Sequence, residues 1–179
     1  MSDPDRVVKR YPHELSGGMQ QRSMIAMGLS CRPDLLIADE PSTALDVTIQ
    51  AQVLTLLDDL RRDLNTSILL ITHNLGVVAW LCEKVAVMYA GKIMEFGDIR
   101  TVFKKARHPY NQALLASMPR IDQEKEKLKA IDGDVPDLIN PPPGCKFHPR
   151  CSLAKEICSR EEPIYREIEP GHWVSCWMA

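Results

Sequence analysis

The stretch from Leu35 to Asp46, LLIADEPSTALD, decides the fold of this chain. Four apolar residues run into two adjacent carboxylates, Asp39 and Glu40, and then into a proline. A short apolar run closed by turn residues predicts a buried strand of a parallel sheet. Ligands of open α/β sheets bind beyond the carboxyl ends of such strands, so both carboxylates are expected at a binding crevice. Asp39 and Glu40 alone would rather indicate a strand end followed by a solvated acidic turn.

Motifs on either side of this stretch favour the binding crevice. Upstream, residues 15–22 are LSGGMQQR, and downstream a second apolar run ends in Ile71-Thr72-His73. The order LSGG-x-Q-Q-R, apolar strand ending in DE, S-x-A-L-D and strand ending in His resembles the ATP-binding-cassette (ABC) ATPases. Each motif is weak alone, but the four together, in the order of that family, are specific.

Composition limits the class of protein. The 179 residues are 45% apolar and 26% charged, which are ordinary values for one globular domain with a small appendage. A net charge of −2 gives no basic field for nucleic acid or anionic membrane. No apolar run reaches the roughly 20 residues of a membrane-spanning helix, and MSDPDRVVKR at the amino end lacks the apolar core of a signal peptide. A cytoplasmic location is therefore expected.

The phosphate loop G-x-x-x-x-G-K-[ST] does not occur in the sequence, and its nearest echo, Gly91-Lys92, is followed by Ile93. The amides and the lysine of that loop hold the phosphates of a nucleotide. In the resembled family the loop lies well before the LSGG motif. We therefore expect the chain to correspond to the carboxyl-terminal portion of such an ATPase and to have no ATPase activity alone.

The LSGG motif predicts the start of a helix over residues 15–30, with Met19, Met24, Met27 and Leu29 as its apolar candidates. Ser16 suits the N-cap, because its hydroxyl can accept a hydrogen bond from an amide two or three residues on. A helix amino end offers free N–H groups to an anion, and glycines allow close approach. The resemblance implies that four residues here contact ATP, whose γ-phosphate is held by a second subunit: Ser16, Gly17, Gly18 and Gln20.

The resemblance also assigns roles at the two strand ends. Asp39 would bind Mg²⁺ through a water, and Glu40 would orient and deprotonate the attacking water. His73 would donate to the γ-phosphate, although a lone histidine at such a place is more often a cap or a satisfied polar residue. Asp46 would lie in a loop that crosses the dimer interface, and it also fits the N-cap of an amphipathic helix over residues 47–64.

The second half of the sequence departs from the generic ATPase. Strands are predicted at Lys84–Tyr89 and Lys92–Phe96, joined by a turn at Ala90-Gly91. Residues 103–119, FKKARHPYNQALLASMP, resemble the extension of ATPases from oligopeptide, dipeptide and nickel importers. INPPPG, residues 139–144, predicts a stiff, extended connector. We predict three parts: an ABC ATPase portion over 1–98, a helical extension and linker over 99–138, and a cysteine-rich tail over 139–179.

Four of the six cysteines lie in the last 35 residues with the spacing C-x₅-C-x₆-C-x₁₇-C: Cys145, Cys151, Cys158 and Cys176. In a cytoplasmic protein they argue against disulfides and for metal or reactive thiols. The spacing is that of neither zinc ribbons nor bacterial ferredoxins, yet four thiols suffice for Zn²⁺ or a [4Fe–4S] cluster. A short tail rich in proline and arginine buries little core, so a metal would supply folding energy. Four free thiols are the alternative.

The segment PPPGCKFHPRC, residues 141–151, resembles the tail of oligopeptide-importer ATPases, some of which are thought to carry an iron–sulfur cluster. The resemblance therefore implies a cluster rather than zinc at the four cysteines. His148 and His172 leave mixed cysteine and histidine ligation of zinc open. Cys31 and Cys82 stand apart on predicted core elements, and we interpret them as buried packing residues.

These observations predict an α/β protein: a partial phosphate-loop NTPase of the ABC type with a parallel sheet core and an irregular cysteine-rich tail. The resemblance implies an ATP- and Mg²⁺-dependent subunit that powers the import of oligopeptides or dipeptides. It implies a second ATPase subunit in a head-to-tail dimer, two membrane permease subunits and, indirectly, an extracytoplasmic peptide-binding protein as partners. Nucleic acid is not expected, and the location would be the cytoplasmic face of the membrane. The alternatives are a soluble ABC ATPase outside transport, and a metal-binding or redox module on an ATPase remnant.

Overall fold

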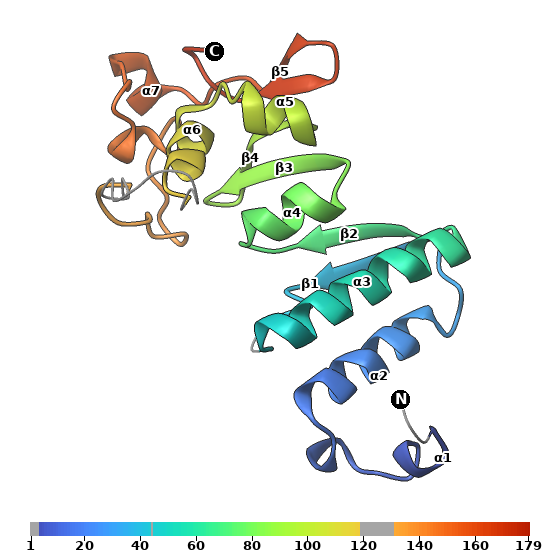
Figure 1. The fold of residues 1–179 in the computed structure, drawn as a ribbon. Helices are drawn as coiled ribbons and strands as arrows, with labels where there is room; N and C mark the ends of the chain where they lie inside the picture. Colours follow the sequence, from blue (N-terminus) through green and yellow to red (C-terminus); the bar gives the residue numbers. More distant parts are fainter. Residues whose placement is uncertain (1–3, 44, 119–130) are drawn as a thin grey trace, which may run out of the picture. The chain divides into compact units, whose positions relative to one another are not determined.

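The structure is a computed structural model that describes residues 4–43, 45–118 and 131–179 (Figure 1). It divides into two compact units, the first ending at Cys82 and the second starting at Glu83. The predicted three parts, with boundaries after residues 98 and 138, stay a prediction. None of the described helices is both long enough and apolar enough to cross a membrane.

The first unit contains a parallel strand pair joined by a long helix. Its elements in order are α1 (Pro4–Val7), a 3₁₀ turn (Pro12–Glu14), α2 (Gly17–Leu29), β1 (Leu35–Asp39), α3 (Val47–Leu64), β2 (Ser67–Ile71) and α4 (Leu75–Leu81). Strands β1 and β2 pair in parallel, with Leu35 opposite Ser67 and Asp39 opposite Ile71. Figure 1 shows α3 running beside both strands as the crossover between them. The predicted strand–helix–strand order is confirmed.

The core of the first unit lies on one face of this strand pair. Leu36 of β1 and Leu70 of β2 pack against a buried cluster that includes Val53 and Leu57 of α3 and Ile25 of α2. The opposite face is open, since four side chains on it are each between 46% and 60% exposed: Leu35, Ile37, Leu69 and Ile71. The expectation of a buried strand is therefore correct for one face only, because no described element covers the other.

Two details of the first unit correct the sequence analysis. Helix α2 buries Ile25, whereas the apolar candidates Met24 and Met27 are exposed, because α2 packs only one narrow side on α3. Cys31 is exposed and Cys82 is half-buried, so the interpretation of both as buried packing residues is wrong for Cys31. Cys31 lies in the turn that follows α2, where no core is available to it.

The second unit is built on an antiparallel sheet. Its elements are β3 (Lys84–Tyr89), β4 (Lys92–Asp98), α5 (Ile99–Lys104), α6 (Pro109–Ala116), a 3₁₀ turn (His148–Arg150), α7 (Glu156–Arg160), β5 (Arg166–Glu169) and β6 (His172–Val174). The strand order is β3-β4-β6-β5. The predicted β3–β4 hairpin is confirmed, and its turn residues Ala90 and Gly91 both have positive φ. Such a two-residue turn matches the twist of the strands it joins.

The cysteine-rich tail is less irregular than predicted, because its last strand completes this sheet. Strand β6 pairs with β4, with Glu95 opposite Val174 and Phe96 opposite Trp173. Residues far apart in the sequence thus share one sheet, in which β6 lies between β4 and β5. Short strands of three or four residues carry little periodic signal, which explains why the sequence analysis missed them.

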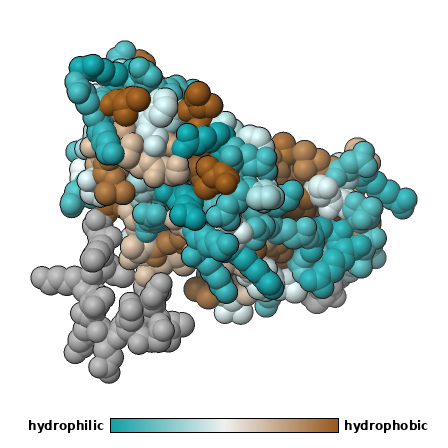
Figure 2. Space-filling model, turned by 90° about the horizontal axis from the view of Figure 1, so that it is seen from above, coloured by the Kyte–Doolittle hydropathy of each residue, from teal (hydrophilic) through white to brown (hydrophobic). Residues whose placement is uncertain are grey.

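An aromatic cluster forms the core of the second unit. Tyr89, Met94 and Phe147 are buried together. The ring centroids of Tyr89 and Tyr110 lie 4.7 Å apart, and those of Tyr110 and Phe147 lie 5.2 Å apart. Aromatic pairs at such distances gain more than their area burial alone. On the face drawn in Figure 2, hydrophobic residues stand in separate groups among hydrophilic ones. Scattered exposed hydrophobic residues of this kind are normal for a protein surface.

Candidate functional sites

The carboxyl ends of β1 and β2 bring Glu40 and His73 together. The amide of Glu40 donates to the Ile71 carbonyl at 2.9 Å, so Glu40 extends the parallel pairing by one residue. Its Oε1 accepts from the His73 backbone amide at 3.1 Å and lies 2.7 Å from His73 Nδ1. Its Oε2 accepts from Thr43 Oγ1 at 2.8 Å. The two residues predicted to act on ATP are therefore neighbours.

These contacts keep Glu40 in its charged form. The hydrogen bond from the His73 side chain, followed by that from Thr43, lowers the pKa of the Glu40 carboxyl. Glu40 also has a left-handed backbone with φ of 45°, an uncommon conformation for a residue with a side chain. The His73 side chain is 82% exposed, and the neighbouring Asp39 is exposed at the end of β1. An ionised, accessible carboxylate can accept a proton or hold a water.

The amino end of α2 has its predicted cap residue but not the predicted cap bond. Ser16 precedes the helix with extended backbone angles, yet its hydroxyl makes no capping hydrogen bond. Gly18 packs closely on α3, because a Cβ there would lie 2.7 Å from Ile49 Cγ2. This contact is a structural reason for one glycine besides anion binding. Gln20 donates from Nε2 to the carbonyls of Pro12 and Leu15, which fixes the approach to the helix.

Asp46 is the N-cap of α3, as the helical interpretation predicted. Its Oδ1 accepts from the Ile49 amide at 2.9 Å. In the loop before it, Ser42 accepts from Gln50 Nε2 at 3.0 Å. The loop is thus held to the first turns of α3 from two sides. Its role at a dimer interface stays a prediction.

The four cysteines of the tail converge on one small cavity, which His108 and Phe147 also line: Cys145, Cys151, Cys158 and Cys176. All four are free thiols. Burial raises the pKa of Cys145, Cys151 and Cys176, and in each case a backbone amide from a residue two positions on opposes the rise.

Backbone amides also reach the sulfurs directly. The Lys155 amide donates to Cys158 Sγ at 3.5 Å, and the Met178 amide donates to Cys176 Sγ at 3.3 Å. Hydrogen bonds of this kind favour the thiolate form of a cysteine. The thiolate, and not the thiol, is the form that binds metals. The chemistry of the donor set therefore fits a thiolate-bound group.

The predicted metal centre is nevertheless not confirmed. Among the described residues, no three His, Cys, Asp or Glu side chains are grouped closely enough to hold a metal ion. His172, left open as a zinc ligand, is engaged elsewhere, because its Nε2 lies 2.8 Å from Glu95 Oε1. His148 lines the cavity, and its Nδ1 lies 2.9 Å from the Cys145 carbonyl oxygen.

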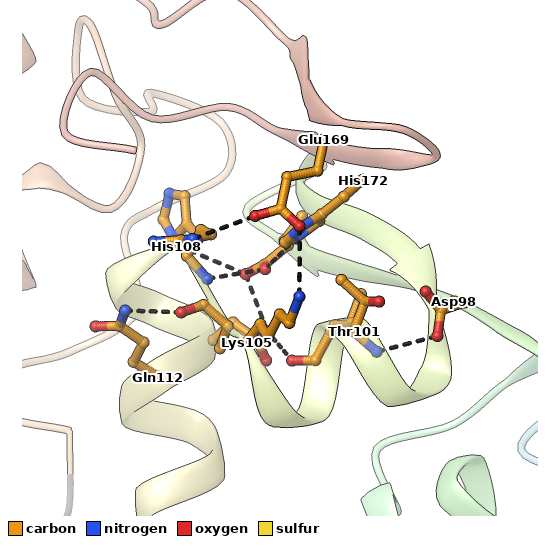
Figure 3. Close-up of polar contacts among 12 residues, drawn as sticks. Asp98, Thr101, Lys105, His108, Gln112, Glu169 and His172 are labelled. Carbon is orange, nitrogen blue, oxygen red and sulfur yellow. Dashed lines mark hydrogen bonds and ion pairs between the residues drawn. The ribbon is translucent and has the colours of Figure 1, made fainter.

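A buried carboxylate that sequence reasoning missed organises the second unit. Glu95 is completely buried, and its Oε1 accepts from the Arg107 amide at 2.9 Å and contacts His172. Its Oε2 accepts from the His108 amide at 3.0 Å and from Asn111 Nδ2 at 2.9 Å. Figure 3 shows His108 and His172 meeting here from α6 and β6. The sequence signal for this site was Glu95 itself, an acidic residue inside the otherwise apolar stretch IMEF, residues 93–96.

His108 occupies the border between this carboxylate and the cysteine cavity. Its side chain is 1% exposed, and its Nδ1 accepts from the Tyr110 amide at 3.0 Å as the N-cap of α6. Burial lowers the pKa of His108 to about 4, although Glu95 and the Ser175 backbone act to raise it. The ring is therefore neutral near pH 7. Its Nε2 is buried without a hydrogen-bond partner of acceptable geometry.

Comparisons with known proteins agree with these features. Residues 94–158 match the family described as "Oligopeptide/dipeptide transporter, C-terminal region", and residues 1–43 match the family described as "ABC transporter". The oligopeptide transport ATP-binding protein OppD of Escherichia coli is 54% identical over 99% of this chain and 52% of its own length. The dipeptide transport ATP-binding protein DppD of Bacillus subtilis is 51% identical over 98% of this chain and 52% of its own length.

A solved structure of a metal-chelate type ABC transporter, in an inward-facing conformation, shares the fold with a TM-score of 0.54. The two sequences are 29% identical, and the match covers 68% of this chain and 47% of that one. The motif order, the parallel pair and these matches show the fold of ABC ATPases over part of a domain, and they confirm the α/β fold predicted from the sequence. Within that class, the chain is most similar in these comparisons to ATP-binding proteins of oligopeptide and dipeptide transport. It spans about half the length of the curated relatives it matches.

Proposed function

We propose that the chain is part of an ATP-hydrolysing subunit that powers the import of oligopeptides or dipeptides. The observation that carries the proposal is the contact of 2.7 Å between Glu40 and His73 at the ends of two parallel strands. Such strand ends are where α/β proteins bind ligands. The oligopeptide and dipeptide relatives, each at least half identical to this chain, support the substrate class.

In this proposal Glu40 is the general base that orients and deprotonates the attacking water. A positioned base contributes about 10²–10⁴-fold to a reaction rate. His73 holds the carboxylate and donates to the γ-phosphate, while Thr43 fixes the other carboxylate oxygen. Asp39, exposed beside the base, binds Mg²⁺ through a water. The phosphate loop comes from the remainder of the complete subunit.

A second subunit completes each ATP site in this scheme. The Ser16 hydroxyl makes no capping hydrogen bond. This hydroxyl and the first amides of α2 are therefore available to a γ-phosphate. Gly17 and Gly18 contribute those amides, and Gln20 and Asp46 shape the loops around them. The two ATPase subunits pair head to tail on the cytoplasmic face of the membrane. They drive two permease subunits that receive peptides from an extracytoplasmic binding protein.

A chimaera tests this function. The amino-terminal half of E. coli OppD, joined to this chain, should restore oligopeptide uptake to an E. coli strain that lacks its own OppD. The substitution Glu40→Gln should abolish uptake and ATP hydrolysis while ATP binding persists, because the base is removed and the phosphate contacts remain. Asp39→Asn should weaken Mg·ATP binding itself. A folded chimaera whose ATPase activity is unaffected by Glu40→Gln would refute the role of Glu40.

We also propose that the four tail cysteines hold one [4Fe–4S] cluster rather than a zinc ion. Four thiols suffice for either group, and the resemblance of residues 141–151 to the tail of importer ATPases favours the cluster. A cluster is a group of several atoms, so its ligands surround a cavity, as these four thiols do. A bound cluster would cross-link the tail. ATP hydrolysis needs no electron transfer, so its role would be structural or regulatory.

Anaerobic purification tests the cluster. The protein should be brown, with roughly four irons per chain, and replacing one cysteine by serine should loosen the tail while leaving residues 4–82 unchanged. A colourless protein with one zinc per chain would replace the cluster by zinc. Metal-free protein whose four thiols are all freely alkylated would remove the centre.

A further inference from the structure

The two carboxylate oxygens of Glu40 differ in the hydrogen bonds that they accept. Oε1 accepts from the His73 backbone amide at 3.1 Å and lies 2.7 Å from His73 Nδ1. Among the described residues, Oε2 has one donor, the Thr43 hydroxyl at 2.8 Å. We propose that Glu40 acts as a base through Oε2, and that Thr43 is the positioning residue that directs this oxygen to the attacking water. This inference rests on the proposed role of Glu40 as general base.

The lone pairs of the carboxylate show which oxygen is open to a water. An ionised carboxylate only accepts hydrogen bonds, with about two sites on each oxygen. Nδ1 of His73 therefore carries a proton in this contact, and the two donors of His73 fill both sites of Oε1. One site of Oε2 stays open beside Thr43. When the water oxygen bonds to the γ-phosphorus, the water gives a proton to Oε2, and ADP leaves with the electron pair of the broken P–O bond.

A tight turn places the Thr43 hydroxyl next to this oxygen. The Thr43 amide donates to the Glu40 carbonyl at 3.2 Å, which closes a turn between them. Pro41 occupies the second position of the turn, where its fixed φ favours the bend. Ser42 is buried and accepts from Gln50 Nε2 at 3.0 Å, so the turn is tied to α3. Both the backbone and the side chain of Thr43 thus return to Glu40.

The Thr43 hydroxyl is not needed to satisfy a buried group. Thr43 is exposed, so water can replace its hydrogen bond, and such a bond adds little to stability. Its effect is on orientation. His73 holds Oε1 only, and the plane of the carboxylate can tilt about that oxygen. The bond to Oε2 fixes the plane and with it the direction of the open site, and a base acts only within hydrogen-bond reach of the proton.

The first test measures the mobility of the Glu40 side chain in the full chain. Thr43→Val replaces the hydroxyl by a methyl group of similar size, and Thr43→Ser keeps the hydroxyl. NMR relaxation should show lower order parameters for the Glu40 side chain in Thr43→Val, and values close to those of the unmodified chain in Thr43→Ser. Thr55→Val is the matched control, because it removes a hydroxyl on α3 that donates to the Ala51 carbonyl at 2.9 Å. Equal order parameters in all of these proteins would overturn the inference.

The second test measures ATP hydrolysis by the chimaera of this chain with the amino-terminal half of E. coli OppD. Thr43→Val should lower kcat by about 10-fold, less than the loss in Glu40→Gln, and leave the KM for ATP unchanged. The reason is that the hydroxyl aims the base and does not hold the nucleotide. Thr43→Ser should recover most of the kcat, and Thr55→Val should hydrolyse ATP like the unmodified chimaera. In a Glu40→Gln chimaera, Thr43→Val should lower the residual rate no further, because the hydroxyl acts through the carboxylate.

The outcomes separate this inference from the proposed function. A full kcat in Thr43→Val, beside an inactive Glu40→Gln, would overturn the role of Thr43 and leave Glu40 as the base. A kcat in Thr43→Ser as low as in Thr43→Val would also overturn it, because the hydroxyl would not be the cause. Full activity of Glu40→Gln would overturn the base itself, and the inference with it.

Discussion

The two units of this chain complete their cores in different ways. The first unit covers one face of its parallel strand pair and leaves Leu35, Ile37 and Leu69 open. The second unit closes its antiparallel sheet with a strand from the end of the chain and satisfies a buried carboxylate, Glu95, with four donors. Parallel sheets are normally covered on both faces. The first unit is therefore incomplete as a core, and the second is complete.

The largest effect should come from Glu95→Ala, which tests the completeness of the second unit. Removing the carboxylate leaves buried donors on Arg107, His108, Asn111 and His172 without an acceptor. We expect a loss of about 3–5 kcal/mol in the free energy of unfolding of residues 83–179. Hydrogen exchange should show the loss of protection there, with residues 4–82 unaffected.

A surface ion pair in the same unit is the matched control. Lys92 Nζ lies 2.8 Å from Glu162 Oε1, and both side chains are about half exposed. Because water screens such pairs, Glu162→Ala should cost less than about 1 kcal/mol. Equal effects at Glu95 and Glu162 would show that the buried carboxylate does not hold the unit together.

The next effect tests the one-sided core of the first unit. Leu57 of α3 is 1% exposed and faces the covered side of the strands, so Leu57→Ala should cost about 2–5 kcal/mol. Ile37 on the open face is 60% exposed, so Ile37→Ala should change stability by about 0.5 kcal/mol or less. Chemical denaturation of both variants measures the difference. A large cost at Ile37 would mean that its face is covered in solution.

A smaller effect is expected at the cap of α3. Asp46→Ala removes the acceptor of the Ile49 amide and should destabilise the first unit by about 1 kcal/mol. Asp46→Asn keeps an oxygen at that position and should restore most of the loss. If both variants were as stable as the original chain, the cap would contribute nothing measurable, and a role at the dimer interface would be the remaining reason for Asp46.

The first unit was the easier part to predict from sequence. Its apolar runs have the length of strands, and its turn residues, such as Asn65 with φ of 51°, lie where breaks were expected. Glu40 and His73 could be placed together because parallel strands end at the same edge of a sheet. The open face could not be foreseen, because local hydrophobicity does not say which element covers a strand.

The second unit was harder, because its key contacts join distant residues. Glu95 and His172 are separated by 77 positions, and no local period links them. The spacing of the cysteines did not reveal that they share a cavity with His108. The four thiols were selected by their clustering in the tail and by its resemblance to importer ATPases. The three-dimensional arrangement then showed that His108 and His148 line their cavity, while His172 contacts Glu95.

The smallest expected effect concerns pH and the Glu40 site of the first unit. The pKa of Glu40 is lowered chiefly by His73, so His73→Ala should raise it toward the ordinary value of a glutamate, and Thr43→Val should raise it less. Because the folded-state pKa lies below the unfolded one, these contacts favour folding above the unfolded pKa. Their contribution is lost as the pH falls through the folded-state pKa. Carboxyl titration by NMR on the unmodified chain, His73→Ala and Thr43→Val measures the order of their Glu40 pKa values. An unchanged Glu40 pKa in His73→Ala would mean that the two side chains do not interact in solution, and the proposed base would then lack its positioning partner.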